Sequence, residues 1–354
     1  MAYVAGTYTA SARAARLLIE TEIMGDASRM SELKMPIVAG QAILMNQDPH
    51  IEEINLGKGK KCINAKVVNI RSASTLRANK TLACTILAGP EAGSDSLTLT
   101  KEVLTKPAAF TILDNQCDNE FDFNKKLAYQ GLKAKIDLEV ELTKVLIALA
   151  AANADVPTAA WFETPGTVVA DAYEVTTANF GSNLIADALA ASMIAKMPNS
   201  IILNGRNLFN DAILAQYKGA ACCDNDSILN SQNYFQLYWD LLNMDAVLGV
   251  GYSLVMDKNS LVFWSSPNYT NMAPELQTGD VYAWVETLPR LTYYMNGAQQ
   301  PIYVDVRAQK VCQLDAYGNE SIGYNYEYVL RGAMVANLTN ADARHGILKI
   351  RKVA

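Results

Sequence analysis

The sequence predicts an α+β fold organised around one unusually long helix. Between Phe121 and Ala154 there is no proline and one glycine, Gly131. An extended and strongly basic stretch precedes this segment, and mixed helices and strands followed by strands alone come after it. Helices of globular proteins average about 11–12 residues. This one would extend over residues 121–154 and be about 50 Å long. A helix of this length is expected to set the arrangement of the rest.

The ends and faces of the long helix are also marked in the sequence. Asp118 and Asn119 are good N-cap residues, and Glu120 and Asp122 place negative charge in the first turn, where it suits the helix dipole. Pro157 follows the expected end. The apolar positions are Leu127, Leu132, Ile136, Leu138, Leu142, Val145, Leu146 and Leu149.

The first 50 or so residues are predicted to form an arm that has no hydrophobic core of its own. Residues 11–23 have helical spacing, with Leu17, Leu18 and Ile23 as the expected apolar stripe. Four charged residues are expected to lie outside that stripe: Arg13, Arg16, Glu20 and Glu22. After this helix the chain is interrupted by Gly25, Pro36, Gly40 and Pro49.

Residues 56–80 carry seven positive charges and no acidic residue. Residues 62–70 and 81–87 fit two strands, and 89–94 a turn. A two-stranded ribbon is marginal in water by itself, so it needs a partner surface. Two interpretations stay open, a solvated ribbon and a ribbon that docks on an acidic surface of a neighbouring subunit. Sequence-specific DNA reading is not expected, because no recognition helix accompanies the ribbon. The charges are Lys58, Lys60, Lys61, Lys66, Arg71, Arg77 and Lys80.

The remaining chain predicts a compact α/β part and a strand-rich closing part. A strand at 96–104 is expected before the long helix and another at 167–175 after it. The α/β part then has a helix at 182–196, a buried strand at 200–204 and a helix at 207–217. Aromatic residues at 234–239 are expected to form core or subunit packing. Strands are then expected at 247–256, 260–264, 281–288, 290–295, 303–311, 321–330 and 333–338. Asn296-Gly297 predicts a hairpin turn, and Pro301 is expected to delay the strand after it.

Composition narrows the class of protein. The 354 residues suggest two domains or one large discontinuous one, and half of them are apolar. The net charge of −6 argues against a surface that binds nucleic acid throughout. Six cysteines without a C-x-x-C pair indicate free thiols in a reducing compartment. The N-terminus has no secretory pattern, and the apolar run 145–152 is too short to span a membrane.

Residues that support catalysis are scarce, so no catalytic, cofactor-binding or metal-binding residue is predicted. The only histidines, His50 and His345, lie in expected arm and tail regions, and no phosphate-binding or dinucleotide motif occurs. Asp224 and Asp226 are interpreted as a polar turn. The carboxylates at 139 and 141 face different directions on the helix and are expected to be solvated rather than to form an acid/base pair.

The order of arm, basic ribbon, strand, very long helix, α/β part and closing strands resembles the major capsid proteins of tailed bacteriophages with the Hong Kong 97-type fold. Three stretches carry the resemblance. Residues 121–154 are similar to the spine helix of that family. Residues 187–208 are similar to the helix, strand and second helix of its axial domain. Residues 303–311 are similar to a late strand of its peripheral domain.

The resemblance implies an N-terminal arm at 1–55, an E-loop at 56–95, a peripheral (P) domain at 96–178 and 281–354, and an axial (A) domain at 179–280. It implies a structural subunit, not an enzyme, that forms pentamers and hexamers of an icosahedral head around double-stranded DNA. The chain would be assembled in the host cytoplasm and reside in the virion capsid. The intersubunit contact residues of the E-loop would be Lys58, Lys60, Lys61, Lys66, Arg71 and Arg77.

Further partners follow from the same resemblance: separate scaffolding, portal and decoration proteins, and packaged DNA held by weak, non-specific contact. Some members of the family crosslink a lysine to an asparagine, but no partner asparagine is identified here and crosslinking is not predicted. Three alternatives remain. They are an encapsulin-type shell protein, another phage structural protein of the minor head or tail, and a cytoplasmic α/β enzyme.

Overall fold

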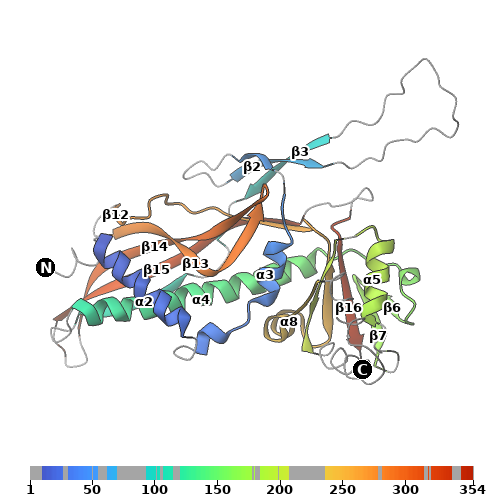
Figure 1. Ribbon diagram of the computed structural model, residues 1–354, viewed down its shortest axis with the longest axis horizontal. Helices are drawn as coiled ribbons and strands as arrows, with labels where there is room; N and C mark the ends of the chain where they lie inside the picture. Colours follow the sequence, from blue (N-terminus) through green and yellow to red (C-terminus); the bar gives the residue numbers. More distant parts are fainter. Residues whose placement is uncertain are drawn as a thin grey trace, which may run out of the picture.

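The computed structural model describes residues 10–26, 31–49, 51–54, 62–69, 93–100, 102–103, 107–114, 120–177, 179, 184–197, 199–206, 236–277, 281–314, 318, 320–336 and 344–353. The long helix runs beneath a long antiparallel sheet, with the arm helix beside it (Figure 1). A second sheet with its own helices lies at the far end of the long helix, and a small sheet stands above the body (Figure 1).

The long helix, α4 (Glu120–Ala152), confirms the strongest sequence prediction to within two residues at each end. It is buried on more than one side, as expected of a helix enclosed by other elements. Three helices and four strands contact it: α2 (Ala10–Gly25), α3 (Val38–Met45), α8 (Leu241–Leu248), β5 (Ala108–Asp114), β13 (Val281–Met295), β15 (Glu320–Ala336) and β16 (Ile347–Val353). Its fully buried apolar side chains include Leu127, Leu132, Ile136, Leu138, Leu142 and Leu146.

The larger sheet has the strand order β11-β15-β14-β13-β12, and β4 and β5 also pair with β15. All its pairings are antiparallel. The strands are β4 (Glu102–Val103), β5 (Ala108–Asp114), β11 (Leu261–Ser265), β12 (Glu275–Leu276), β13 (Val281–Met295), β14 (Ala298–Leu314) and β15 (Glu320–Ala336).

Strands expected to be separate are continuous in this sheet. The predicted strands 281–288 and 290–295 are both parts of β13, and a register shift between Thr287 and Thr292 accommodates Pro289. The Asn296-Gly297 turn is confirmed, because both residues have positive φ, 53° and 73°, as a primed hairpin turn requires. The expected delay at Pro301 is wrong. β14 starts at Ala298, and Pro301 lies opposite Thr292 beside the irregular stretch.

The smaller sheet has the order β6-β7-β16-β10-β8-β9, with parallel pairing of β7 to β16 and of β8 to β9. Its strands are β6 (Thr167–Val169), β7 (Ala172–Thr176), β8 (Ile201–Asn204), β9 (Gln236–Trp239), β10 (Tyr252–Met256) and β16 (Ile347–Val353). The helices α5 (Leu184–Ile194) and α8 (Leu241–Leu248) and the short 3-10 turn η2 (Ala159–Trp161) accompany it.

Two local features of this sheet differ from the expectation. The strand expected at 247–256 begins only at Tyr252, because α8 extends to Leu248 and two glycines with positive φ, Gly249 and Gly251, turn the chain first. The strand β16 near the C-terminus was not predicted. The helix expected at 207–217 lies outside the described residues.

Each of the two sheets contains strands from more than one of the domain ranges inferred from the resemblance. Those domain ranges remain a proposal. The strands β6, β7 and β16 belong to the smaller sheet although their residues fall in the expected P-domain ranges. Conversely, β11 and β12 belong to the larger sheet although they fall within 179–280. Each half of the body therefore uses segments from distant parts of the chain.

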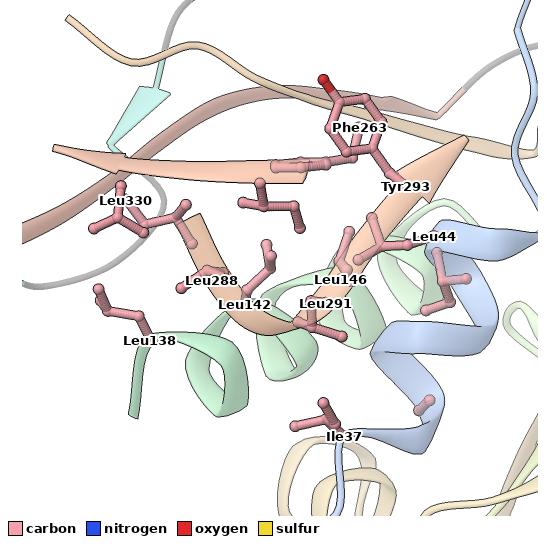
Figure 2. Close-up of a cluster of buried hydrophobic side chains, with 14 of the residues drawn as sticks. Ile37, Leu44, Leu138, Leu142, Leu146, Phe263, Leu288, Leu291, Tyr293 and Leu330 are labelled. Carbon is pink, nitrogen blue, oxygen red and sulfur yellow. The ribbon is translucent and has the colours of Figure 1, made fainter. Parts of the chain in front are cut away.

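The main core lies between α4, the helix α3 (Val38–Met45) and the larger sheet. Figure 2 shows Leu138, Leu142 and Leu146 of α4 directed toward Leu288 and Leu291 of β13. Burying one such side chain stabilises the fold by about 1.5–3 kcal/mol. A separate core under the smaller sheet includes Phe162, Tyr173, Val175, Ile202, Val255 and Leu348.

Candidate subunit-contact site

The small sheet above the body is formed by β1 (Ile51–Ile54), β2 (Cys62–Asn69) and β3 (Gly93–Thr100). Both pairings are antiparallel, and β2 and β3 run in register from Cys62 opposite Thr100 to Asn69 opposite Gly93. The sequence predicted a ribbon of two strands at 62–70 and 81–87. The partners of the first strand are instead β1 and β3, and 81–87 lies outside the described residues.

The predicted contact residues fall mostly outside the described part of the chain. Lys66 lies in the middle of β2, opposite Ser96 of β3. The other five lie beyond the described residues, so the basic contact surface stays a prediction. In the sequence the basic residues fall between β1 and β3, and the sheet that these strands form lies above the main body in Figure 1. The five are Lys58, Lys60, Lys61, Arg71 and Arg77.

The arm helix α2 (Ala10–Gly25) lies against α4 and confirms the predicted helix, but not its buried face. Leu17 and Leu18 of the expected apolar stripe are 41% and 62% exposed. Arg16 and Glu20, expected outside that stripe, are buried together with Ile23. These three positions are spaced i, i+4 and i+7 and therefore share one face. The predicted stripe is confirmed at Ile23 and wrong at Leu17 and Leu18, because the charged partners of Arg16 and Glu20 come from far along the chain and draw these two residues inward.

Those partners complete a buried group of four charges, which we call the charge quartet: Arg16, Glu20, Lys135 and Glu286. Lys135 Nζ donates to Glu20 Oε2 at 2.6 Å and to Glu286 Oε2 at 3.2 Å. Arg16 donates to the other oxygen of Glu286, which also accepts a bond of 2.8 Å from Trp284 Nε1. Arg16 Nε lies 3.6 Å from Glu20 Oε1 on the same helix. The charge quartet joins α2, α4 and β13.

Burial and charge act in opposite directions on the two carboxyl groups of the quartet. Burial raises the pKa of Glu286, but Arg16 and Lys135 outweigh it and lower the pKa to about 2. For Glu20, burial dominates over Lys135 and raises the pKa above its ordinary value. Glu286 is therefore the ionised centre of the quartet.

The lowered pKa of Glu286 predicts a specific acid sensitivity. A carboxyl group with a depressed folded-state pKa contributes stability above its ordinary pKa of 4.5, and this is lost as the pH falls toward about 2. The free energy of unfolding of the unchanged chain should therefore fall more steeply between these pH values than that of Glu286→Gln. Urea titrations at stepped pH measure this. Glu141→Gln, at an exposed position, should keep the slope of the unchanged chain, and equal slopes for all three proteins would contradict the assignment.

Glu139 was expected to be solvated, and that prediction was wrong. Its side chain is fully buried, whereas Glu141 is about half exposed and pairs loosely with Lys144. The Glu139 carboxylate accepts hydrogen bonds from the backbone N of Arg290 at 2.7 Å, its Nε at 2.6 Å and the backbone N of Leu291 at 3.2 Å. Burial is the main cause that raises the pKa of Glu139, and Arg290 opposes it. The two carboxylates are not an acid/base pair.

Arg290 extends this contact to the arm, since its Nη1 donates to the carbonyl oxygens of Leu33 and Met35, both at 3.1 Å. Leu33 belongs to the 3-10 turn η1 (Ser31–Lys34) that follows α2. The helix α2 and the turn η1 thus each have a polar contact point with the body, the charge quartet for α2 and the Glu139–Arg290 pair for η1. Neither point was visible in the sequence, because both depend on residues more than 100 positions apart.

A third buried ion pair fixes the loop before β12. Asp305 is fully buried and pairs with Arg331 of the neighbouring strand. The backbone N of Asn268 donates to both oxygens of Asp305 at 3.0 Å, and the backbone N of Tyr269 donates to one of them at 3.1 Å. A carboxylate whose two oxygens are occupied in this way positions backbone and has little capacity left for a substrate.

Over the described residues we find no arrangement suited to catalysis. No group of three metal-binding side chains occurs there. A hollow of about 410 Å³ lies on the face of β5, β14 and β15, where Arg307 and Glu327 pair at 3.0 Å and Thr111 bonds to Asn325. Its lining contains no histidine or cysteine. Within the same described part, no helix combines the length and the apolar character needed to cross a bilayer.

Comparisons with known proteins give matches among solved structures alone. No family profile matches the chain, and no curated protein matches it. The chain is similar to a chain of the capsid of Ralstonia phage GP4 at 11% identity, with 87% of this chain and 86% of that chain covered and a TM-score of 0.41. A chain of Microbacterium phage Oxtober96 matches at 11% identity, 89% and 91% coverage and a TM-score of 0.43. A chain of the capsid of the empty GTA particle matches at 11% identity, with 90% of this chain and 97% of that chain covered and a TM-score of 0.40.

Proposed function

We propose that this chain is the major capsid subunit of a tailed bacteriophage, a structural protein that assembles into pentamers and hexamers of an icosahedral head around double-stranded DNA. The observation that carries the proposal is the order and connection of parts. An arm helix, a small sheet standing apart from the body, a 33-residue helix under a long antiparallel sheet, and a second α/β unit follow one another as in the Hong Kong 97-type fold.

The physics of the parts supports a role in a shell. A small sheet of three short strands is only marginally stable by itself, so it is stabilised when a neighbouring subunit covers it. Homo-oligomers with closed symmetry supply such a neighbour for every copy. Each contact between subunits contributes a modest free energy. Once one contact has formed in a closed assembly, the effective concentration of the remaining contacts is high, so their summed free energy is large.

We assign the basic segment to the contact between subunits. Seven cations without an acidic residue at 56–80 favour docking on an acidic surface of the next subunit. The net charge of −6 supplies acidic surface elsewhere on the same chain. Contact with packaged DNA would then be weak and non-specific, and strongly salt-dependent DNA binding by the isolated subunit would count against this. Portal, scaffolding and decoration proteins are further proposed partners, and the virion is the proposed location.

Charge reversal tests the assignment. The triple variant Lys60→Glu, Lys61→Glu, Arg71→Glu should stay folded and lose most shell assembly, because three attractive contacts per subunit become repulsive. The control reverses three exposed cations of the body, Lys125, Lys258 and Lys310, and changes the net charge by the same amount. Sedimentation and circular dichroism of both variants measure assembly and folding. Normal shells from the first variant would refute the contact between the basic segment and the next subunit.

The same preparation separates the alternatives. A shell that encloses protein cargo and no DNA would indicate an encapsulin-type compartment. Tubes or small rings would indicate another phage structural protein. A stable monomer by light scattering would favour an enzyme.

A further inference from the structure

The charge quartet has an unusual division between its two sides. Arg16 and Glu20 both belong to α2, while Lys135 of α4 and Glu286 of β13 both belong to the body. Each side contributes one cation and one anion. The two buried pairs described above differ, because Glu139–Arg290 and Asp305–Arg331 each have one cation and one anion and would leave both unpaired if separated.

Each side of the quartet also pairs within itself. Arg16 Nε and Glu20 Oε1 face each other at 3.6 Å in an i, i+4 arrangement, and Lys135 Nζ and Glu286 Oε2 are 3.2 Å apart. Separating α2 from the body therefore leaves a neutral ion pair on each surface. The large penalty for an uncompensated buried charge does not arise in that separation.

The docked state is, in addition, incompletely bonded. Arg16 Nε and Glu20 Oε1 are buried and have no hydrogen-bond partner within the described part of the chain. The hydroxyl of Tyr328, beside the quartet, is also buried and also has no hydrogen-bond partner among the described residues. A buried polar network with unsatisfied members stabilises less than a complete one. Water reaching these atoms on opening would offset part of the contacts that are lost.

Over residues 16–25, the part of α2 whose side chains the structure describes, apolar contact with the body is small. The core cluster beneath α2 has three fully buried members, Ile23 of α2 and Leu132 and Ile136 of α4. Ile19 and Met24 are only partly buried there. The cluster between α4 and the larger sheet holds many more buried side chains. Elements with few buried apolar contacts open locally at lower free energy than the core.

We propose that α2 is a detachable latch. It closes on α4 and β13 through the charge quartet and opens as a unit when the quartet splits into its two neutral pairs. Opening exposes a groove on the body that contains Lys135, Glu286, Leu132 and Ile136, and frees the face of α2 that fits it. The latch is a property of the single chain and does not depend on the proposed shell function.

Hydrogen exchange of the full-length, unassembled chain tests the latch. Backbone amides of α2 between Arg16 and Gly25 should exchange at least about tenfold faster than those of α4 between Leu132 and Leu146, because they open without global unfolding. If both segments exchange at one common rate that follows global unfolding, α2 is an integral part of the core and the proposal fails. This comparison needs no variant.

Matched variants test the role of the quartet. Arg16→Met with Glu20→Gln, and Lys135→Met with Glu286→Gln, each remove one neutral side, and both should speed exchange in α2 by roughly tenfold or more. The quadruple variant buries no charge at these four positions. The amides of α2 should therefore exchange more slowly in it than in either double variant. Lys144→Met, at a partly exposed position of α4, should change α2 exchange less than about twofold. A quadruple variant that exchanges faster than both double variants would overturn the assignment of the quartet as the closing contact.

Discussion

Replacing Glu139 by glutamine is expected to lower the free energy of unfolding by about 3–5 kcal/mol, the largest loss that we expect for a glutamate-to-glutamine change on α4. The carboxylate is fully buried and accepts three hydrogen bonds from Arg290 and Leu291. Glutamine keeps the shape but not the charge, so the Arg290 guanidinium, which is mostly buried, loses its counter-ion. Chemical denaturation followed by circular dichroism gives the free energy.

The matched control is Glu141→Gln, two residues further along the same helix. Its side chain is 49% exposed and lies 3.8 Å from Lys144, so the change should stay within about 0.5 kcal/mol of the unchanged chain. If the two variants lose the same amount of stability, the buried contact between Glu139 and Arg290 does not hold the arm and the sheet to α4.

Replacing Gly40 by alanine is expected to destabilise the chain by about 1–3 kcal/mol, although alanine normally favours a helix interior over glycine by about 1 kcal/mol. Gly40 lies in α3, where that helix packs directly against Thr143 of α4. An added Cβ would overlap Thr143 Oγ1 and lie 3.0 Å from its Cβ and 3.2 Å from its Cα. The backbone of Thr143 cannot move aside without shifting α4. Thermal or urea unfolding measures the loss.

Gly25→Ala is the control for Gly40→Ala, because no atom lies within 4 Å of a Cβ added there. It should be neutral or slightly stabilising. Adding Thr143→Ala to Gly40→Ala should recover part of the loss, since it removes the nearest atom, the hydroxyl oxygen, but leaves the backbone of α4 in place. A stabilising Gly40→Ala would mean that α3 and α4 are further apart than described.

The long helix could be predicted because its signals are local. Caps, the apolar spacing and the absence of proline all lie close to or within 121–154, and α4 follows them closely. The helix of the arm was also predicted, but its buried face was not. The pattern of Leu17, Leu18 and Ile23 suggested a stripe, whereas partners from α4 and β13 draw Arg16 and Glu20 inward. Burial of charge depends on tertiary pairing, which a single segment does not encode.

Similar reasons explain the other differences. Strand breaks were placed at Pro289 and Pro301, yet neighbouring strands keep β13 and β14 continuous around an irregular register. The burial of Glu139 depends on Arg290, which is 151 residues away. The predicted contact site lies mostly outside the described residues. Its charge pattern is clear in the sequence, but of its six residues only Lys66 lies within a described strand.

Electron microscopy of the purified full-length chain tests the shell assignment most directly. At assembly concentrations we expect closed, icosahedral particles of uniform diameter, with pentameric and hexameric clusters visible on their surface. Light scattering of the same sample should show that most of the protein is in such particles. Stable monomers alone, or open tubes, would contradict the assignment of the chain as a shell subunit, provided that circular dichroism shows the helices to be folded under the same conditions.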